Sequence, residues 1–372
     1  MTKKYCIFLS ALFCAFLGVF LVANAVSPDR TFSQMENRNL EQLPVPSVKT
    51  LLNGQFMKDF ETYTTDQFVG RDGWIALKST TERVLGKKEN NNVYFAAGDT
   101  LISRFDEPDG EKVTNNLNYV NNFVENVDIP VYFSLIPTQA CIWADRLPEG
   151  APNASQTDLL TQAQAATQAN WYDTYPSLWA HRDEDIFYRT DHHWTSLGAY
   201  YGYTALMEAM GMEPVDLADY ERTTVTDQFY GTIFSASGVR WVAPDRIDTY
   251  IPADGVKVTS YFDGTPSQGS LYVDSYLEVK DKYSYFLGGV QPLCVVETGL
   301  TDAPRLLLIR DSYSDSLTPF LTQSFSQIHL FDPRYNLSSI QGYIQDNGID
   351  AVAVLYSIPN YIADEYQFVL SR

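Results

Sequence analysis

Apolar positions follow a helical period in some parts of the chain and form short compact runs in others. Residues 51–86 carry apolar side chains every three or four positions, which predicts helices interrupted near Gly70. Residues 111–127 show the same period, whereas 92–97 and 131–136 are short apolar runs typical of strands. Strand, helix and strand in this order predict an α/β sheet with parallel strands.

The same rhythm returns near the C-terminus, after a stretch of different character. Residues 156–179 are helical in character, and 220–300 are rich in Thr, Tyr, Val and Phe with several turn signals, which predicts an antiparallel β-rich insertion. Beyond it the pattern predicts three strands and two helices: 306–309, 329–331 and 351–356 as strands, 314–325 and 338–346 as helices. We therefore expect one α/β domain over residues 51–372.

The first 26 residues differ from all the others. Lys3 and Lys4 precede a nearly unbroken apolar run, and about 20 such residues suffice to cross a bilayer. The run ends in small residues at 23–25 that suit a signal-peptide cleavage site. A retained anchor and a cleaved signal both fit. In either case the leading lysines predict that the rest of the chain lies outside the cytoplasm, beginning with a polar, proline-containing linker at 27–50.

Composition narrows the possible partners. The chain has 372 residues, of which 45% are hydrophobic, enough for a substantial core. The formal net charge of −20 argues against nucleic acid and against anionic lipid headgroups as partners. Outside the apolar segment only Cys141 and Cys294 remain, so a disulfide is possible but not implied. Without a Cys/His cluster, a structural zinc site is not expected.

Two runs of residues could carry chemistry. The first is Tyr-Arg-Thr-Asp-His-His-Trp-Thr at 188–195, which holds half of the four histidines and precedes a predicted helix. Thr195 or Ser196 can cap that helix. The second is Arg-Asp-Ser-Tyr-Ser at 310–314, between a predicted strand and a predicted helix. A serine in this position lies at the carboxyl end of a strand, where helix N–H groups can stabilise an oxyanion.

Together the two runs predict a catalytic triad. Ser312 would be the nucleophile and His193 the general base, with Asp191 orienting the imidazole. We prefer the second histidine because residues two apart face the same way in an extended chain. Further residues could contact the oxyanion or the substrate: Asn360, Trp194, Tyr313, His192 and Arg189.

Each part of this triad has another interpretation. An Asp-Ser pair at the start of a helix is often only a cap, and a His-His pair can be structural. Asp191, His192 and His193 could also bind a metal ion, since imidazole and carboxylate are ordinary ligands.

The two runs resemble a known family. Asp-His-His-Trp before a helix, with Asp-Ser-Tyr-Ser after a late strand, resembles the bacterial DHHW family. It is also similar to the periplasmic alginate O-acetyltransferase group, whose members look like circularly permuted SGNH hydrolases, with the Asp-x-His-Trp motif ahead of the serine. The resemblance runs from about Phe56, through Asp66-Gln67-Phe68 and Arg71, to the last strand. Arg310 stands where the SGNH serine motif begins with glycine.

The resemblance implies a fold and an activity. The fold would be an SGNH hydrolase-like three-layer domain with a parallel sheet and a β-rich insertion. The activity would be addition or removal of O-acetyl groups on a cell-surface polysaccharide, without cofactor or metal, with a membrane-bound acyltransferase as a possible acyl source. Two alternatives stay open: a non-catalytic glycan-binding or polysaccharide-assembly protein, and a metal-dependent hydrolase at the Asp-His-His motif.

Overall fold

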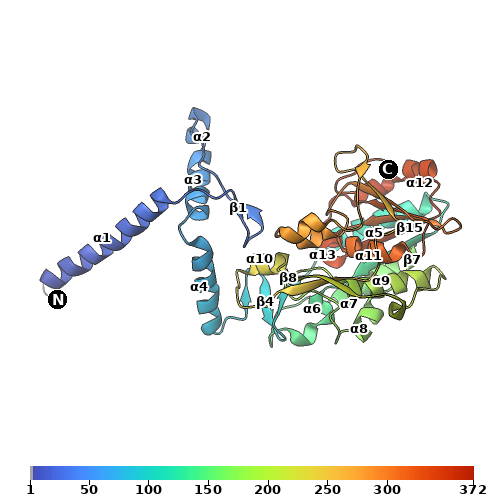
Figure 1. Ribbon diagram of the computed structural model, residues 1–372, viewed down its shortest axis with the longest axis horizontal. Coiled ribbons are helices and arrows are strands. Elements are labelled where there is room, and N and C mark those ends of the chain that lie inside the picture. The colour runs from blue at the N-terminus through green and yellow to red at the C-terminus, as the bar shows by residue number, and fades with distance from the viewer. Residues whose placement is uncertain (1–2) are drawn as a thin grey trace. The chain divides into compact units, whose positions relative to one another are not determined.

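The computed structural model describes residues 3–372, and the chain divides into two compact units (Figure 1). Unit 1 comprises Met1–Lys87 and Gly238–Trp241, and unit 2 comprises Lys88–Ser237 and Val242–Arg372. The short second piece of unit 1 is held by helix α4 (Arg71–Val84) of that unit, because the Ser79 hydroxyl donates a 3.0 Å hydrogen bond to the Gly238 carbonyl.

Unit 1 is mainly helical. It contains one two-stranded hairpin and four helices: β1 (Phe32–Ser33), β2 (Arg38–Asn39), α1 (Lys3–Val26), α2 (Val48–Leu52), α3 (Gln55–Asp66) and α4 (Arg71–Val84). The predicted break between helices is confirmed at Gly70, whose φ of 69° is a left-handed conformation that favours glycine. By length and composition, α1 could cross a membrane.

An eight-stranded sheet forms the centre of unit 2, in the order β11-β10-β12-β14-β13-β15-β6-β7. The strands from β14 to β7 are parallel, and the other three are antiparallel. Their bounds are β6 (Val131–Ile136), β7 (Asn170–Trp171), β10 (Lys257–Ser260), β11 (Ser267–Gln268), β12 (Leu293–Glu297), β13 (Arg305–Arg310), β14 (Gln327–Phe331) and β15 (Ala351–Ser357). Unit 2 is therefore a mixed α/β unit with a mostly parallel sheet.

The central strands form where the sequence has unbroken apolar runs. Every residue of β15 is buried, and so is every residue of β13 after Arg305. A strand covered on both faces requires such a run. The helices of the unit are α5 (Gly110–Glu125), α6 (Gln139–Ile142), α7 (Gln156–Ala166), α8 (Tyr175–Ala180), α9 (Ser196–Ala209), α10 (Thr232–Ser237), α11 (Tyr313–Leu321), α12 (Ile340–Asn347) and α13 (Ile358–Ala363). Of these, α9 packs against α11, and α5 packs against α13.

The structure corrects one predicted element. Residues 156–179 are not helical throughout, because β7 lies between α7 and α8 and pairs with β6. Asn170 also donates a side-chain hydrogen bond of 3.1 Å to the Val131 carbonyl. Pairing with a neighbouring strand outweighs the local helical pattern at this point.

The β-rich stretch at 220–300 contributes to two sheets. β8 (Thr223–Phe229) and β9 (Asp245–Thr249) form a separate two-stranded antiparallel sheet, whereas β10, β11 and β12 extend the large sheet beyond β14. A third, three-stranded sheet is formed by β3 (Glu89–Asn90), β4 (Val93–Ala96) and β5 (Thr100–Ser103).

Candidate active site

The Asp-His-His-Trp run forms a tight loop before α9. Phe187 and Trp194 pair as an antiparallel bridge, so the residues between them turn back sharply. Thr195 caps α9 as predicted: its hydroxyl accepts a hydrogen bond of 3.2 Å from the Gly198 N–H. The loop is thus fixed at both of its ends.

Trp194 attaches this loop to the serine-bearing turn. Its side chain is completely buried, and its indole N–H donates to the Tyr313 carbonyl at 2.9 Å. The ring lies against α9 where the helix carries glycines. A Cβ at Gly202 would come within 2.6 Å of the indole, and a Cβ at Gly198 would be 2.1 Å from the Ile186 carbonyl oxygen. Gly202 therefore leaves room for the indole ring, and Gly198 leaves room for the Ile186 backbone beside it.

Ser312, His193 and Asp191 form a chain of two hydrogen-bonding contacts, from Ser312 to His193 and from His193 to Asp191. The Ser312 Oγ lies 2.8 Å from the His193 Nε2, although the residues are 119 positions apart in the chain. The His193 Nδ1 lies 2.5 Å from the Asp191 Oδ1. With Nδ1–H donating to the carboxylate, Nε2 is left to accept the serine proton. The structure thus brings together the three residues that the sequence singled out.

The Asp191 carboxylate is buried and held by several donors. One oxygen also accepts the His193 backbone N–H at 3.0 Å, and the other accepts the Thr232 backbone N–H at 2.7 Å and its hydroxyl at 2.9 Å. Burial favours the neutral acid, but His192, His193 and these hydrogen bonds outweigh it and hold the pKa of Asp191 well below its usual value. The carboxylate is therefore ionised and immobile.

Two rings enclose the His193 imidazole. Tyr283 stacks on one side with ring centroids 3.7 Å apart and an interplanar angle of 8°, and His192 lies 3.8 Å away at 37°. The Tyr283 hydroxyl also donates to the Ser312 carbonyl at 3.0 Å. This tyrosine therefore contacts both the histidine and the backbone of the serine, and His193 is only 4% exposed.

Asp311 organises the turn on the other side of Ser312. Its carboxylate accepts hydrogen bonds from the Tyr313 N–H at 3.0 Å, the Ser357 N–H at 2.8 Å and hydroxyl at 2.7 Å, and the Asn360 amide at 2.7 Å. Asn360, at the start of α13, is thereby joined to the residue that precedes the serine. The side chain of Ser312 itself stays partly exposed.

Below the turn lies a buried ion pair. The Arg310 guanidinium contacts the Asp315 carboxylate at 2.7 Å, and both side chains are almost completely buried. The arginine that replaces the expected glycine is therefore paired beneath α11 and does not reach the surface.

The remaining predicted substrate contacts have different surroundings. Trp194 and Tyr313 are both buried, and the Tyr313 hydroxyl donates to the His192 carbonyl. Stacking of these two rings on a sugar therefore does not fit the structure. His192 is partly exposed, and its Nδ1 lies 2.6 Å from the Thr232 hydroxyl.

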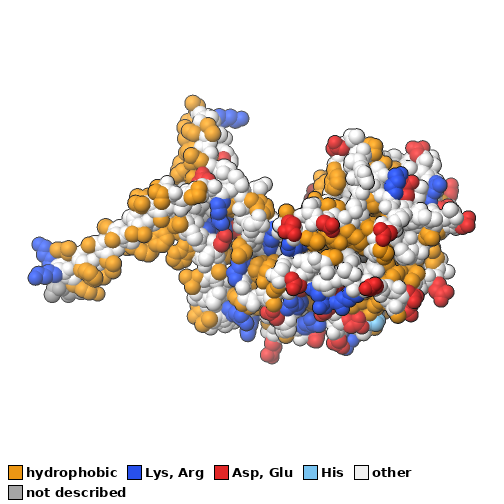
Figure 2. Space-filling model, viewed as in Figure 1, with side chains coloured by type: hydrophobic (Ala, Val, Ile, Leu, Met, Phe, Trp, Pro, Cys, Tyr) orange, Lys and Arg blue, Asp and Glu red, His pale blue; other side chains and the backbone are white. Residues whose placement is uncertain are grey.

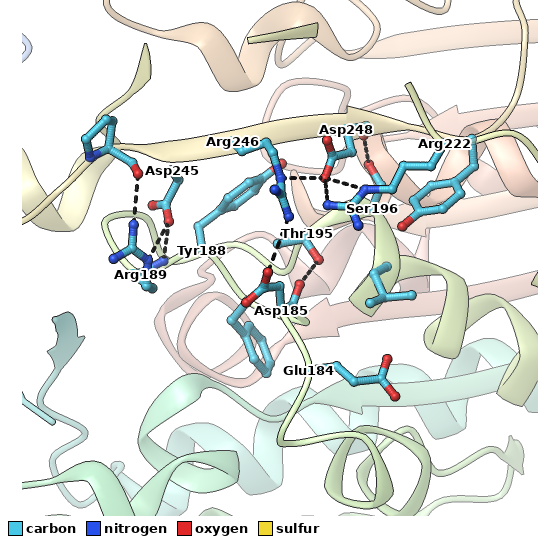
Figure 3. Close-up of a pocket in the computed structure, with 14 residues that line it drawn as sticks. Glu184, Asp185, Tyr188, Arg189, Thr195, Ser196, Arg222, Asp245, Arg246 and Asp248 are labelled. Atoms are coloured by element: carbon cyan, nitrogen blue, oxygen red, sulfur yellow. Dashed lines mark hydrogen bonds and ion pairs between the residues drawn. The ribbon is translucent and has the colours of Figure 1, made fainter. Parts of the chain in front are cut away.

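Arg189 lies in a polar pocket that flanks the Asp-His-His-Trp run (Figure 3). The pocket has a volume of about 570 Å³. Arg189 forms ion pairs there with Asp99 at 3.2 Å and with Asp245 at 3.3 Å. Farther along the pocket, Asp248 pairs with Arg222 at 2.6 Å, as the dashed lines in Figure 3 show.

The same side chains could in principle hold a metal ion, since one ligand atom from each of Asp191, His192 and His193 lies within 4.8 Å of the others. Both ring nitrogens of His193 are, however, already directed at Asp191 and Ser312. A metal on either nitrogen would break one of these contacts, so the arrangement fits proton transfer better than metal binding.

In the described part of the chain, all four cysteines are free, so Cys141 and Cys294 do not form a disulfide.

Sequence reasoning missed three residues that shape the site. Thr232 binds both Asp191 and His192, and Tyr283 stacks on His193. Gly231 leaves room for the carboxylate, because a Cβ there would lie 2.2 Å from the Asp191 Cβ. All three come from the β-rich stretch, whose composition indicated turns and strands but no contact with the motif.

Comparisons with known proteins place this geometry in context. A DHHW family protein from Eubacterium siraeum DSM 15702 is 28% identical, with a TM-score of 0.67, covering 76% of this chain and 95% of that one. PatB1 of Bacillus cereus is 22% identical, with a TM-score of 0.62, and the match covers 73% of this chain and 97% of that one. A second structure of PatB1, with a sulfonyl adduct, is 23% identical, with a TM-score of 0.61, and the match covers 73% of this chain and 96% of that one. At this identity, PatB1 supports the fold alone.

No curated protein matches the chain in sequence. The family described as DHHW protein matches residues 128–331, which include the Asp-His-His-Trp loop and Ser312. This is more than half of the 372 residues, and the chain therefore belongs to the DHHW family.

Proposed function

We propose that the protein is a serine-dependent acyl-transfer enzyme that adds or removes O-acetyl groups on a cell-surface polysaccharide. The observation that carries the proposal is the continuous hydrogen-bonded path from Ser312 through His193 to Asp191. A serine hydroxyl is a poor nucleophile unless a base is aligned with it, and this path supplies that base.

The proposed reaction has two halves. Ser312 Oγ attacks the acetyl carbonyl while His193 Nε2 takes its proton, and Asp191 stabilises the resulting imidazolium. The imidazolium then protonates the departing alcohol, which leaves an acetyl-serine. In the second half, His193 takes a proton from the acceptor, and the acceptor attacks the acetyl-serine. The bond between the acetyl carbon and Ser312 Oγ then breaks, and the imidazolium returns the proton to the serine oxygen. Water as acceptor gives an esterase, and a sugar hydroxyl gives a transferase.

Oxyanion stabilisation is assigned to groups beside the serine. Ser312 directly precedes α11, so its own N–H lies at the positive end of that helix. An amide side chain has two N–H donors, and Asn360 uses one of them for Asp311. The other makes Asn360 the side-chain candidate for the oxyanion hole.

The substrate class and location rest on the resemblance to the alginate O-acetyltransferase group and on α1. An apolar N-terminal helix behind two lysines suits an exported protein, as either a signal or an anchor. We further propose that the large sheet and its helices form an SGNH hydrolase-like layered domain within residues 51–372. A transferase outside the cytoplasm needs a source of acyl groups. We propose that a membrane-bound acyltransferase partner supplies them.

The test measures turnover of a chromogenic acetyl ester by the purified full chain. We expect Ser312→Ala and His193→Ala to abolish turnover, and chelator to have no effect. Ser314→Ala is the matched control, since this buried serine lies in the same turn and should leave activity intact. A sulfonyl fluoride should modify Ser312 in the wild type and fail to do so in His193→Ala, as mass spectrometry would show.

Other outcomes favour the alternatives. Turnover that survives both triad substitutions but is lost with chelator would favour a metal-dependent hydrolase. Absence of turnover and of sulfonyl labelling, with glycan binding unchanged in Ser312→Ala, would favour a binding protein. The pocket of Figure 3 is the observation that favours a glycan-binding protein as the second candidate, because its lining offers charged side chains and Tyr250 to a polar ligand.

A further inference from the structure

Unit 1 exposes an apolar stripe along α4. Four large side chains recur at helical spacing on one side of the helix and are strongly exposed: Trp74 (46%), Leu77 (56%), Val84 (81%) and Leu85 (81%). Single exposed apolar residues are common, but four on one side of a helix, interrupted here only by Thr81, mark a binding surface.

The opposite side of α4 is already occupied within the same unit. Ser79 is buried and donates to the Gly238 carbonyl, and the Arg83 guanidinium lies 4.5 Å from the centre of the Trp241 ring. The stripe is therefore the outward face of a helix whose inner face is packed.

The stripe is continuous with the apolar N-terminal helix. The Phe20 ring of α1 stacks on Phe68 at 5.7 Å and contacts Trp74 at 5.9 Å. The Asn24 amide oxygen accepts the Val69 N–H at 2.8 Å. A largely apolar groove of about 500 Å³ lies between the two helices and ends at Leu77. The C-terminal turns of α1 are therefore a packed part of unit 1, and cleavage after Ala25 would remove them.

The two units also differ in net charge. Unit 1 has eleven Lys and Arg against eight Asp and Glu, a net charge of +3. The remaining 15 basic and 38 acidic residues give unit 2 a net charge of −23. The space-filling view shows hydrophobic side chains along α1 and its neighbouring helices, and many acidic side chains on unit 2 (Figure 2). The acidic character that argued against lipid headgroups thus belongs to unit 2.

We propose that α1 is retained and that the stripe on α4 lies in the interface of the lipid bilayer that α1 crosses. A tryptophan suits the headgroup level, and a lysine at the edge of the stripe can extend its charge outward while its aliphatic stem stays apolar. Trp74 and Lys78 occupy these positions. A helix with an apolar face and basic flanks lies flat in such an interface. This inference does not depend on the chemistry proposed for Ser312.

The test is spin labelling of the full chain in phosphatidylethanolamine–phosphatidylglycerol vesicles. Cys6→Ala, Cys14→Ala and Cys141→Ala remove the exposed and partly exposed thiols, whereas Cys294 is buried, and burial raises its pKa to about 12. Labels are placed at Leu77→Cys and Leu85→Cys. A control label at Thr114→Cys lies on an exposed helical position of α5 in unit 2.

We expect the two stripe labels to collide more with oxygen, which concentrates in lipid, than with a water-soluble nickel chelate. The control label should show the reverse. Stripe labels that behave like the control would overturn the proposal, because the stripe would then lie in water. Labels shielded from both reagents would also overturn it, since a protein surface would then cover the stripe. Mass spectrometry of membrane-purified protein must find α1 present, and a chain that begins after Ala25 would refute the retained anchor.

Discussion

Gly231 lies where the Asp191 carboxylate needs space. A Cβ at this position would approach the Asp191 carboxylate to 2.3 Å, so Gly231→Ala must displace that side chain. We expect a loss of stability of about 1–3 kcal/mol, the usual cost of overpacking, and a larger proportional loss of esterase turnover. Melting temperature and turnover would be compared with Gly299→Ala, where a Cβ meets nothing within 4 Å. Equal behaviour of the two variants would contradict the packing argument.

Asp191 should also make stability depend on pH. Its pKa in the folded protein lies below the unfolded value of about 3.9. The ionised carboxylate therefore contributes stability that is present above about pH 4 and is lost as the pH falls toward the folded-state pKa. Denaturant titrations should show that the advantage of wild type over Asp191→Asn shrinks on acidification. The exposed Asp302→Asn provides the control, and a gap that stays constant with pH would refute the assignment.

At the residue scale, the sequence predicted the three residues that the structure brings together, but not the residues that support them. Asp191, His193 and Ser312 could be found because histidine is rare in this chain, and because the three residue types are chemically matched and lie at the edges of elements. Thr232 and Tyr283 are ordinary residues in a β-rich stretch, and their role arises only when that stretch folds against the motif. No local pattern encodes such a long-range contact.

At the element scale, the turn from β13 to α11 depends on a buried ion pair. Asp315→Ala would leave the Arg310 charge buried without its partner, and such losses cost about 3–5 kcal/mol. The double variant Arg310→Met with Asp315→Ala should cost less than Asp315→Ala alone, since no unpaired charge remains. Free energies of unfolding for the two singles and the double would decide this. A double variant no more stable than Asp315→Ala alone would contradict the expectation.

Elements were predicted well wherever burial alone defines them. The bounds of β6 were predicted to the residue, because an apolar run flanked by polar residues has one consistent placement in a sheet. β7 was missed, because two residues carry too little pattern to compete with a surrounding helical period. The antiparallel strand β12 was placed in an insertion, since composition does not reveal that it pairs with β14.

At the scale of the whole molecule, the charge of unit 2 should select among substrates. A net charge of −23 repels anionic molecules and is screened by salt. We expect kcat/KM for an acetylated uronic-acid oligosaccharide to rise several-fold between low and physiological ionic strength, and that for a neutral acetylated oligosaccharide to stay constant. The neutral substrate serves as the control. Identical salt dependence for the two substrates would show that the field of unit 2 does not act at the site.

The strand order also has a consequence for biogenesis. β15, near the C-terminus, lies between β13 and β6 and supplies hydrogen bonds to both. Because the chain is synthesised from its N-terminus, the apolar strand β6 is made long before β15 (Ala351–Ser357), the strand with which it forms most of its pairs. The parallel part of the sheet therefore cannot close between β13 and β6 before β15 has been made. The same strand also joins β13, which leads into the Ser312 turn, to β6, so that the arrangement proposed as the active site can assemble only once β15 has paired.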